Sequence, residues 1–298
     1  MKRLLHAWRL LLFILLAIIT YLFFSTNIRD YLFRPWIADE LYPTFYSYFY
    51  YLYRFNSVME EIPRFFQFFT PLLAGFAGLR YCQRKQSYFG LLAPRLGRQR
   101  RLYLREAFGE AFSVAAASYL AYLIFFVVEY IWQRPSSQPF DPDYLNGYFL
   151  RDIFGRGLYA QHLPLFHLIA GLFTIFLSVF SLALLSCAFG LLLNRPYKAY
   201  IATLLYFFTL TIGLNRLNQA LTQAAYERGQ LVPFAWFNYM GYFEPARIIC
   251  PHSIAREPGT TAIFHPSTPL IVFGNLLPVL LVWIAVLYYL RKRQKERL

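Results

Sequence analysis

The stretch QRKQSYFGLLAPRLGRQRRLYLREAF, residues 83–108, carries seven basic residues and one acidic residue between two of the most apolar parts of the chain. The composition explains its setting. The chain is 58% hydrophobic and 21% aromatic, and only 15% of its residues are charged, against roughly a quarter in a soluble protein. With so little polar surface to face water, the chain is expected to lie in a bilayer.

Six windows are apolar enough to cross that bilayer as helices. A hydrocarbon core of about 30 Å requires roughly 20 consecutive apolar residues in a helix. The sequence therefore predicts a single all-α transmembrane domain over residues 1–298, with spans at residues 7–25, 64–81, 109–132, 164–192, 197–215 and 268–290. Runs such as LLFILLAIITYLFF are unbroken, which favours helices over the alternating pattern of a β-barrel.

The first apolar run is interpreted as a retained helix. Lys2 and Arg3 resemble the charged start of a signal peptide. The run that follows is longer than the apolar region of a signal peptide, however, and no cleavage site of small residues comes after it.

Lysine and arginine positions predict the orientation. If both termini are cytoplasmic, most of the 29 basic residues lie in the inner segments, and the basic residues of the outer segments are balanced by acids. This is the positive-inside asymmetry of membrane proteins. Residues 83–108 then form a cytoplasmic connection, and the same asymmetry explains the high pI without nucleic-acid binding.

The predicted connections differ on the two sides. Inside, a tight turn at residues 194–198 joins the fourth and fifth spans, because Pro196 and its charged neighbours stop one helix and start the next. Outside, the connections are long, at residues 26–63, 133–163 and 216–267. The last contains a helical stretch at residues 218–229, and the first is rich in aromatic residues typical of the membrane interface.

Small and acidic residues add two expectations within the spans. Pro71, Gly75 and Gly78, with residues 115–118 in the next span, allow close helix approach, either within the chain or in a dimer. Glu110 lies near the inner end of the third span, where a carboxylate reaches the headgroups cheaply.

Motifs for catalysis are weak. No GxxxxGK[ST] is present for ATP phosphates, and the five histidines have no metal-ligand spacing. Glu60, Glu61 and Arg64 form EExxR, one residue shorter than the EExxxR of intramembrane CAAX-type proteases. Carboxylates near a helix entrance are also favourable through the helix dipole alone.

The basic connection has the form of a docking element. Tyr88, Phe89 and Leu92 form an apolar piece that Pro94 ends, and an arginine series follows. Such a stretch can lie as a short helix along the membrane surface, with its arginines toward phosphates or an acidic partner. The arginines are Arg95, Arg98, Arg100, Arg101 and Arg105.

This segment resembles part of the ABC-2-type transporter permeases. Pro71-Leu72-Leu73-Ala74 matches that family's "PLLA" span, and RRLYLR at residues 100–105 resembles the start of its "RxxYLxxK" entry to the next span. The resemblance implies a multi-pass permease in a bacterial plasma membrane, with a short cytoplasmic coupling helix around residues 83–98.

The same resemblance implies the partners. ATP–Mg would bind to a separate cytoplasmic ATPase dimer, and a second permease subunit would complete the pathway, so this chain would hold no cofactor and catalyse no reaction. The resemblance indicates no substrate, whereas the large aromatic outer loops favour an amphipathic one, lipid-like or peptide-like. A membrane sensor or scaffold and a CAAX-type protease are the alternatives.

Overall fold

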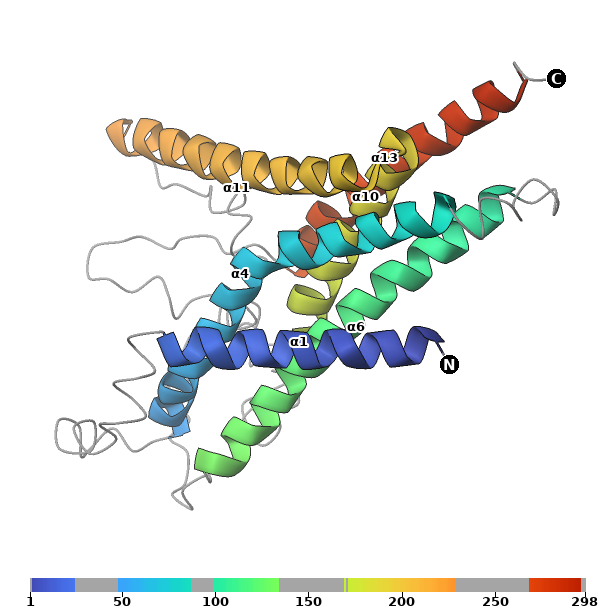
Figure 1. Ribbon diagram of the computed structural model, residues 1–298. Helices are drawn as coiled ribbons and strands as arrows, with labels where there is room; N and C mark the ends of the chain where they lie inside the picture. Colours follow the sequence, from blue (N-terminus) through green and yellow to red (C-terminus); the bar gives the residue numbers. More distant parts are fainter. Residues whose placement is uncertain are drawn as a thin grey trace.

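The computed structural model describes residues 2–24, 48–86, 99–133, 169, 171–228 and 268–295. Every regular element in these ranges is helical (Figure 1). The elements are α1 (Lys2–Phe24), α4 (Tyr48–Gln86), α6 (Gln99–Gln133), a π-helical turn η2 (Leu172–Phe176) that continues into α10 (Leu177–Leu193), α11 (Pro196–Glu227) and α13 (Thr268–Lys295). The predicted all-α class is therefore confirmed.

Three segments of the described chain are long and apolar enough to cross a membrane. They are Arg101–Val128, Leu172–Leu193 and Phe273–Lys292, which correspond to the third, fourth and sixth predicted spans. A shorter apolar helix, Trp8–Phe24, corresponds to the first. The second and fifth predicted spans are helical, within α4 and α11. The number of crossings and the cytoplasmic placement of the termini stay predictions.

Helix α10 is the centre of the bundle. It packs against α4, α6, α11 and α13, while α1 lies on α6 and α4. Small side chains allow this crowding, because they let neighbouring helix backbones approach closely. Buried small residues of α10 include Ser178, Ser181, Ala183, Ser186, Ala188 and Gly190.

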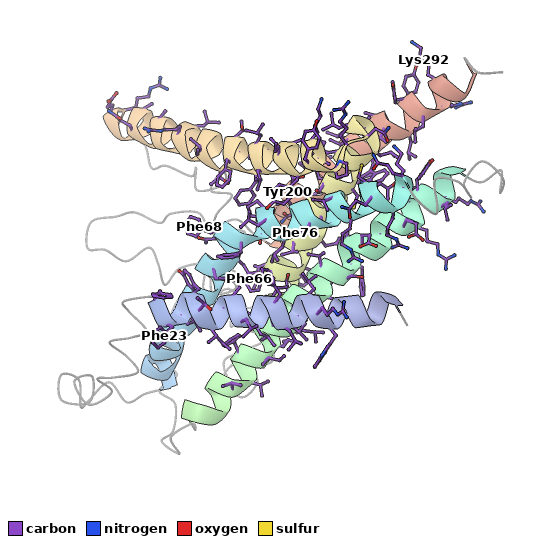
Figure 2. The ribbon with its side chains drawn as sticks, viewed as in Figure 1. Phe23, Phe66, Phe68, Phe76, Tyr200 and Lys292 are labelled. Atoms are coloured by element: carbon purple, nitrogen blue, oxygen red, sulfur yellow. The ribbon has the colours of Figure 1, made fainter. Side chains whose placement is uncertain are left out.

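Glycines set the closest approach. A Cβ at Gly78 of α4 would lie 2.1 Å from Oγ of Ser186 and 2.6 Å from its backbone oxygen, and a Cβ at Gly75 would lie 2.6 Å from the ring of Tyr200. Figure 2 shows Tyr200 beside Phe76, with ring centroids 5.7 Å apart. The predicted close approach is therefore confirmed within the chain for Gly75 and Gly78.

Hydrogen bonds between helices tie the apolar core together. The Thr203 hydroxyl donates to Oγ of Ser186 (2.7 Å), the Ser181 hydroxyl donates to Oδ1 of Asn275 (3.2 Å), and Nε1 of Trp283 donates to the carbonyl oxygen of Leu184 (3.1 Å). In all three bonds one partner belongs to α10. In an apolar surrounding such bonds hold helices in one register.

Two of the connections that the sequence predicts on the outer side are shorter than predicted. Residues 48–63 belong to α4, because this helix begins at Tyr48. The helical stretch predicted within residues 218–229 continues α11 without a break as far as Glu227. Helix hydrogen bonds form between residues of the same helix and do not require lipid, so a helix can continue past its most apolar part.

The tight turn at residues 194–198 is confirmed. Only Asn194 and Arg195 separate α10 from α11, and Asn194 is left-handed with φ 54°. Asparagine tolerates this conformation better than most residues. Pro196 then opens α11, where a missing N–H costs nothing.

Candidate functional site

The predicted docking residues fall in two groups. Arg100, Arg101 and Arg105 lie on the first turns of α6, which begins at Gln99. The helix that contains the third predicted span, residues 109–132, therefore starts before the apolar residues do. The other predicted residues lie outside the described ranges: Tyr88, Phe89, Leu92, Pro94, Arg95 and Arg98.

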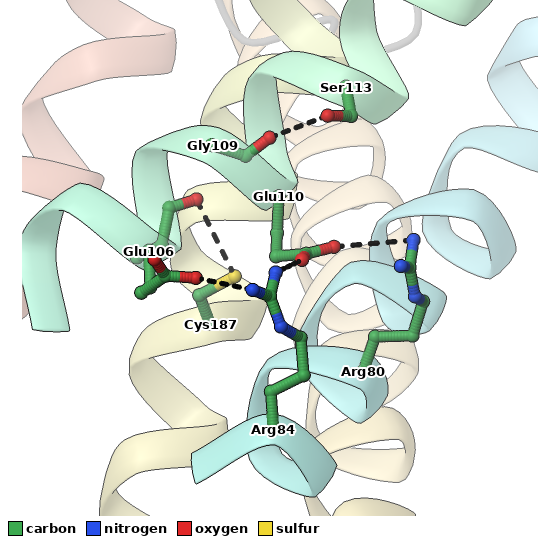
Figure 3. Close-up of polar contacts among 8 residues, drawn as sticks. Arg80, Arg84, Glu106, Gly109, Glu110, Ser113 and Cys187 are labelled. Atoms are coloured by element: carbon green, nitrogen blue, oxygen red, sulfur yellow. Dashed lines mark hydrogen bonds and ion pairs between the residues drawn. The ribbon is translucent and has the colours of Figure 1, made fainter. Parts of the chain in front are cut away.

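Ion pairs join the two helices that flank residues 87–98. Nη2 of Arg84 at the end of α4 lies 2.9 Å from Oε2 of Glu106 on α6. Arg84 also pairs with Glu110 through its other terminal nitrogen, and Nη1 of Arg80 lies 3.3 Å from Oε2 of Glu110. Figure 3 shows both guanidinium groups converging on these carboxylates. We call these four residues the arginine–glutamate clamp.

The two glutamates of the clamp are more buried than its two arginines. The side chain of Glu110 is 3% exposed and that of Glu106 is 12% exposed, while those of Arg80 and Arg84 are 28% and 35% exposed. A carboxylate this buried is stable as a charge only when cations pair with it. The expectation that Glu110 reaches the headgroups is therefore wrong, because it faces α4 instead.

Further contacts beside the clamp also hold the first turns of α6. The hydroxyl of Tyr81, which is fully buried, donates to the carbonyl oxygen of Tyr103 (3.3 Å). On the neighbouring helix, Sγ of Cys187 lies 4.0 Å from the carbonyl oxygen of Ala107 (Figure 3). Cys82 and Cys187 are both buried and free. The first turns of α6 are thus held by both α4 and α10.

The last turn of α4 also caps the end of α10. Nζ of Lys85 donates to the carbonyl oxygen of Leu191 and to Oδ1 of Asn194, both at 3.0 Å. Nε2 of Gln86 donates to the carbonyl oxygen of Asn194 (2.8 Å). The final carbonyls of a helix lack partners within it and carry partial negative charge, so a lysine satisfies and stabilises them.

Four helices therefore meet where residues 87–98 connect α4 to α6. The clamp joins α4 to α6, and Lys85 with Gln86 joins α4 to the α10–α11 turn. On Figure 1, the start of α1 and the end of α13 lie on the same side of the bundle as these helix ends. A force applied to residues 87–98 would reach all four helices through charged and polar contacts.

Sequence reasoning missed the clamp, although a signal for it exists. Arg80 and Arg84 are four residues apart at the end of one apolar helix, and Glu106 and Glu110 are four apart at the start of the next. Residues four apart share a helix face, so two such pairs of opposite charge indicate that these faces meet.

Other predicted chemistry stays untested. Glu60, Glu61 and Arg64 fall on α4, and their side chains lie outside the described ones. Within the described ranges, no group of three or more histidine, cysteine or acidic residues could hold a metal ion.

Comparison of the chain with protein-family models, with curated proteins and with solved structures finds no match. The ABC-2-type resemblance thus depends on the sequence motifs alone.

Proposed function

We propose that this chain is the membrane subunit of an ATP-driven transporter of the ABC-2 type. Six helices would cross a bacterial plasma membrane with both termini in the cytoplasm. A separate ATPase dimer would bind and hydrolyse ATP, and a second permease subunit, identical or related, would complete the pathway for an amphipathic substrate.

The clamp is the observation that supports this proposal. A coupling segment transmits force only if its ends are firmly attached to the helices that must move. Residues 87–98 leave α4 beside Arg84, which pairs with two carboxylates of α6, and beside Lys85, which binds the end of α10. Plain topological anchoring requires positive charge, but it does not require these contacts.

The mechanism then follows from rigid helices. ATP binding would close the ATPase dimer and displace residues 87–98. Since the clamp joins α4 to α6 and Lys85 joins α4 to the end of α10, the displacement would pass to all three helices. The permease would switch between two packings by a shift in their populations, without chemistry in this chain.

Charge reversal in the connection tests the coupling. The triple variant R95E/R98E/R101E should insert normally and lose co-purification with an ATPase in mild detergent, because the docking charges are reversed. The matched control R291E/K292E reverses two exposed cations at the end of α13 and should retain the ATPase. Unchanged co-purification and unchanged ATPase stimulation in the triple variant would contradict the proposal.

Thiol labelling tests the orientation. Gln83 is exposed on the last turns of α4, whereas Cys82 is buried. With Cys250 replaced by serine, Gln83→Cys should react with a membrane-impermeant maleimide only after the cells are opened. Labelling of intact cells would place this end of the bundle outside and exclude docking of a cytoplasmic ATPase.

A further inference from the structure

One exposed face of α6 carries basic residues in its first turns and aromatic residues in the turns that follow. Arg101, Arg105, Phe108 and Phe112 are spaced at i, i+4, i+7 and i+11, which aligns them along one face of a helix. All four are exposed, with Phe108 and Phe112 at 52% and 57%. Within the described part of the chain, neither Arg101 nor Arg105 forms an ion pair with an acidic residue.

The aromatic part of this face extends onto the neighbouring helix. The rings of Phe108 and Phe180 lie 5.6 Å apart, those of Phe112 and Phe176 lie 5.8 Å apart, and Phe176 stacks on Phe180 at 5.8 Å. Phe176 ends η2 and Phe180 belongs to α10. Four rings from two helices therefore form one continuous apolar surface beneath the arginines.

We propose that this surface binds an anionic phospholipid. The phosphate would lie between the guanidinium groups of Arg101 and Arg105, which match phosphate oxygens in geometry and charge. One acyl chain would follow the four rings, since a helix rises about 1.5 Å per residue and Phe112 lies roughly 10 Å below Arg105. The inference depends on α6 crossing the membrane, as in the proposed function, but not on transport.

The position of the rings favours a lipid over an acidic protein segment. Phe108, Phe112, Phe176 and Phe180 all lie within the segments Arg101–Val128 and Leu172–Leu193, which are long and apolar enough to cross a membrane. An acidic polypeptide could reach the arginines, but it could not enter hydrocarbon to cover the rings. A phospholipid carries both complementary parts in one molecule.

The end of α13 provides an internal comparison. Arg291 and Lys292 are also exposed and follow exposed tyrosines, and Figure 2 shows Lys292 pointing away from the bundle. These two cations are adjacent in sequence, so they project about 100° apart around the helix. They attract anionic lipid in general but do not form a shared phosphate site.

Native mass spectrometry of the purified chain tests the proposal. The probes are phosphatidylglycerol and phosphatidylcholine with identical acyl chains, offered in equal amount to the chain in detergent without an ATPase. The wild type should retain phosphatidylglycerol in preference by on the order of tenfold, because two basic residues contribute. R101Q/R105Q should lose most of this preference, and R291Q/K292Q should keep it.

Two results would overturn the site. One is equal retention of both lipids by the wild type, which needs no variant and is independent of whether R101Q/R105Q folds. The other is an unchanged preference in a folded R101Q/R105Q or in the single variant R105Q. If the chain prefers phosphatidylglycerol but no ATPase co-purifies with it, the lipid site is supported and the transport proposal is contradicted.

Discussion

Helices α10 and α13 are both apolar enough to cross a membrane, yet they occupy opposite environments. In the apolar segment Leu172–Leu193, which contains α10, 72% of the apolar stretch is buried inside the molecule. In Phe273–Lys292 of α13 the buried share is 22%. The exposed side chains of α13 are large: Phe273, Leu277, Leu280, Leu281, Ile284, Tyr288 and Tyr289.

The difference shows that hydrophobicity does not decide which helix lies at the centre. Lipid tails are as apolar as leucine, so burying an apolar side chain between helices gains little from the hydrophobic effect. Close backbone approach and hydrogen bonds decide instead. Helix α10 has Ser186 and Gly190 against Gly78 of α4, and it accepts bonds from Thr203 and Trp283.

Among single substitutions, Gly78→Val should lower the free energy of unfolding the most. The new Cβ would overlap Ser186, including its backbone oxygen, so α4 and α10 must separate. We expect a loss of about 3 kcal/mol or more of unfolding free energy, measured by denaturation in detergent. The control is Gly213→Val on α11, since a Cβ there meets nothing within 4 Å. Equal losses in both variants would refute the central role of this contact.

Glu110→Gln should cause the second largest loss of unfolding free energy. It removes the carboxylate that pairs with both Arg80 and Arg84 and leaves their charges partly buried. We expect a loss of about 2–3 kcal/mol. Glu106→Gln removes one partner of a more exposed pair and should cost about 1 kcal/mol or less. The same denaturation assay checks the order, and a larger effect of Glu106→Gln would show that Glu110 is not the centre of the clamp.

Asn194→Ala should destabilise the α10–α11 turn by a smaller amount. Both Asn194→Ala and Asn194→Gly remove the acceptor for Lys85, but only glycine adopts φ 54° without strain. Asn194→Ala should therefore be less stable than Asn194→Gly by about 1 kcal/mol. Thermal unfolding of the two purified variants measures this difference. Indistinguishable midpoints would mean that the turn relaxes to another conformation.

Ile284→Ala should have the smallest effect. Its side chain is 59% exposed on α13, so truncation changes contact with lipid and leaves the bundle intact, within about 0.5 kcal/mol. Val286→Ala on the same helix is the matched control, because Val286 is 1% exposed and its truncation leaves a cavity costing about 1–2 kcal/mol. A large effect of Ile284→Ala alone would indicate that this face contacts another protein.

The helices were more predictable than their ends. Each of the six apolar windows falls on a helix wherever the structure describes it, because about 20 apolar residues have few other solutions in a bilayer. The starts at Tyr48 and Gln99 were missed, and the helical stretch predicted within residues 218–229 was not recognised as the end of α11. Apolar content marks the part of a helix suited to lipid, and it carries no signal where the helix continues beyond it.

The site was predicted only in part. The basic connection was found from its composition, and Arg101 and Arg105 are exposed there as a docking role requires. Lys85 and Arg84 belong to the same quoted stretch, but charge counting could not show that one binds the end of α10 and the other binds two glutamates of α6. Those contacts depend on how α4 and α6 are rotated toward each other.

By itself, the sequence determined that this protein is helical, that several helices suit a membrane, and that positive charge gathers at particular helix ends. These properties depend on local composition and on the cost of unpaired backbone groups in hydrocarbon. Only the tertiary structure decided that α10 is enclosed, that α13 is exposed and that Glu110 is buried between two arginines. Those outcomes depend on which small residues and charges face each other across helices, and residues that are distant in sequence meet only after the helices pack.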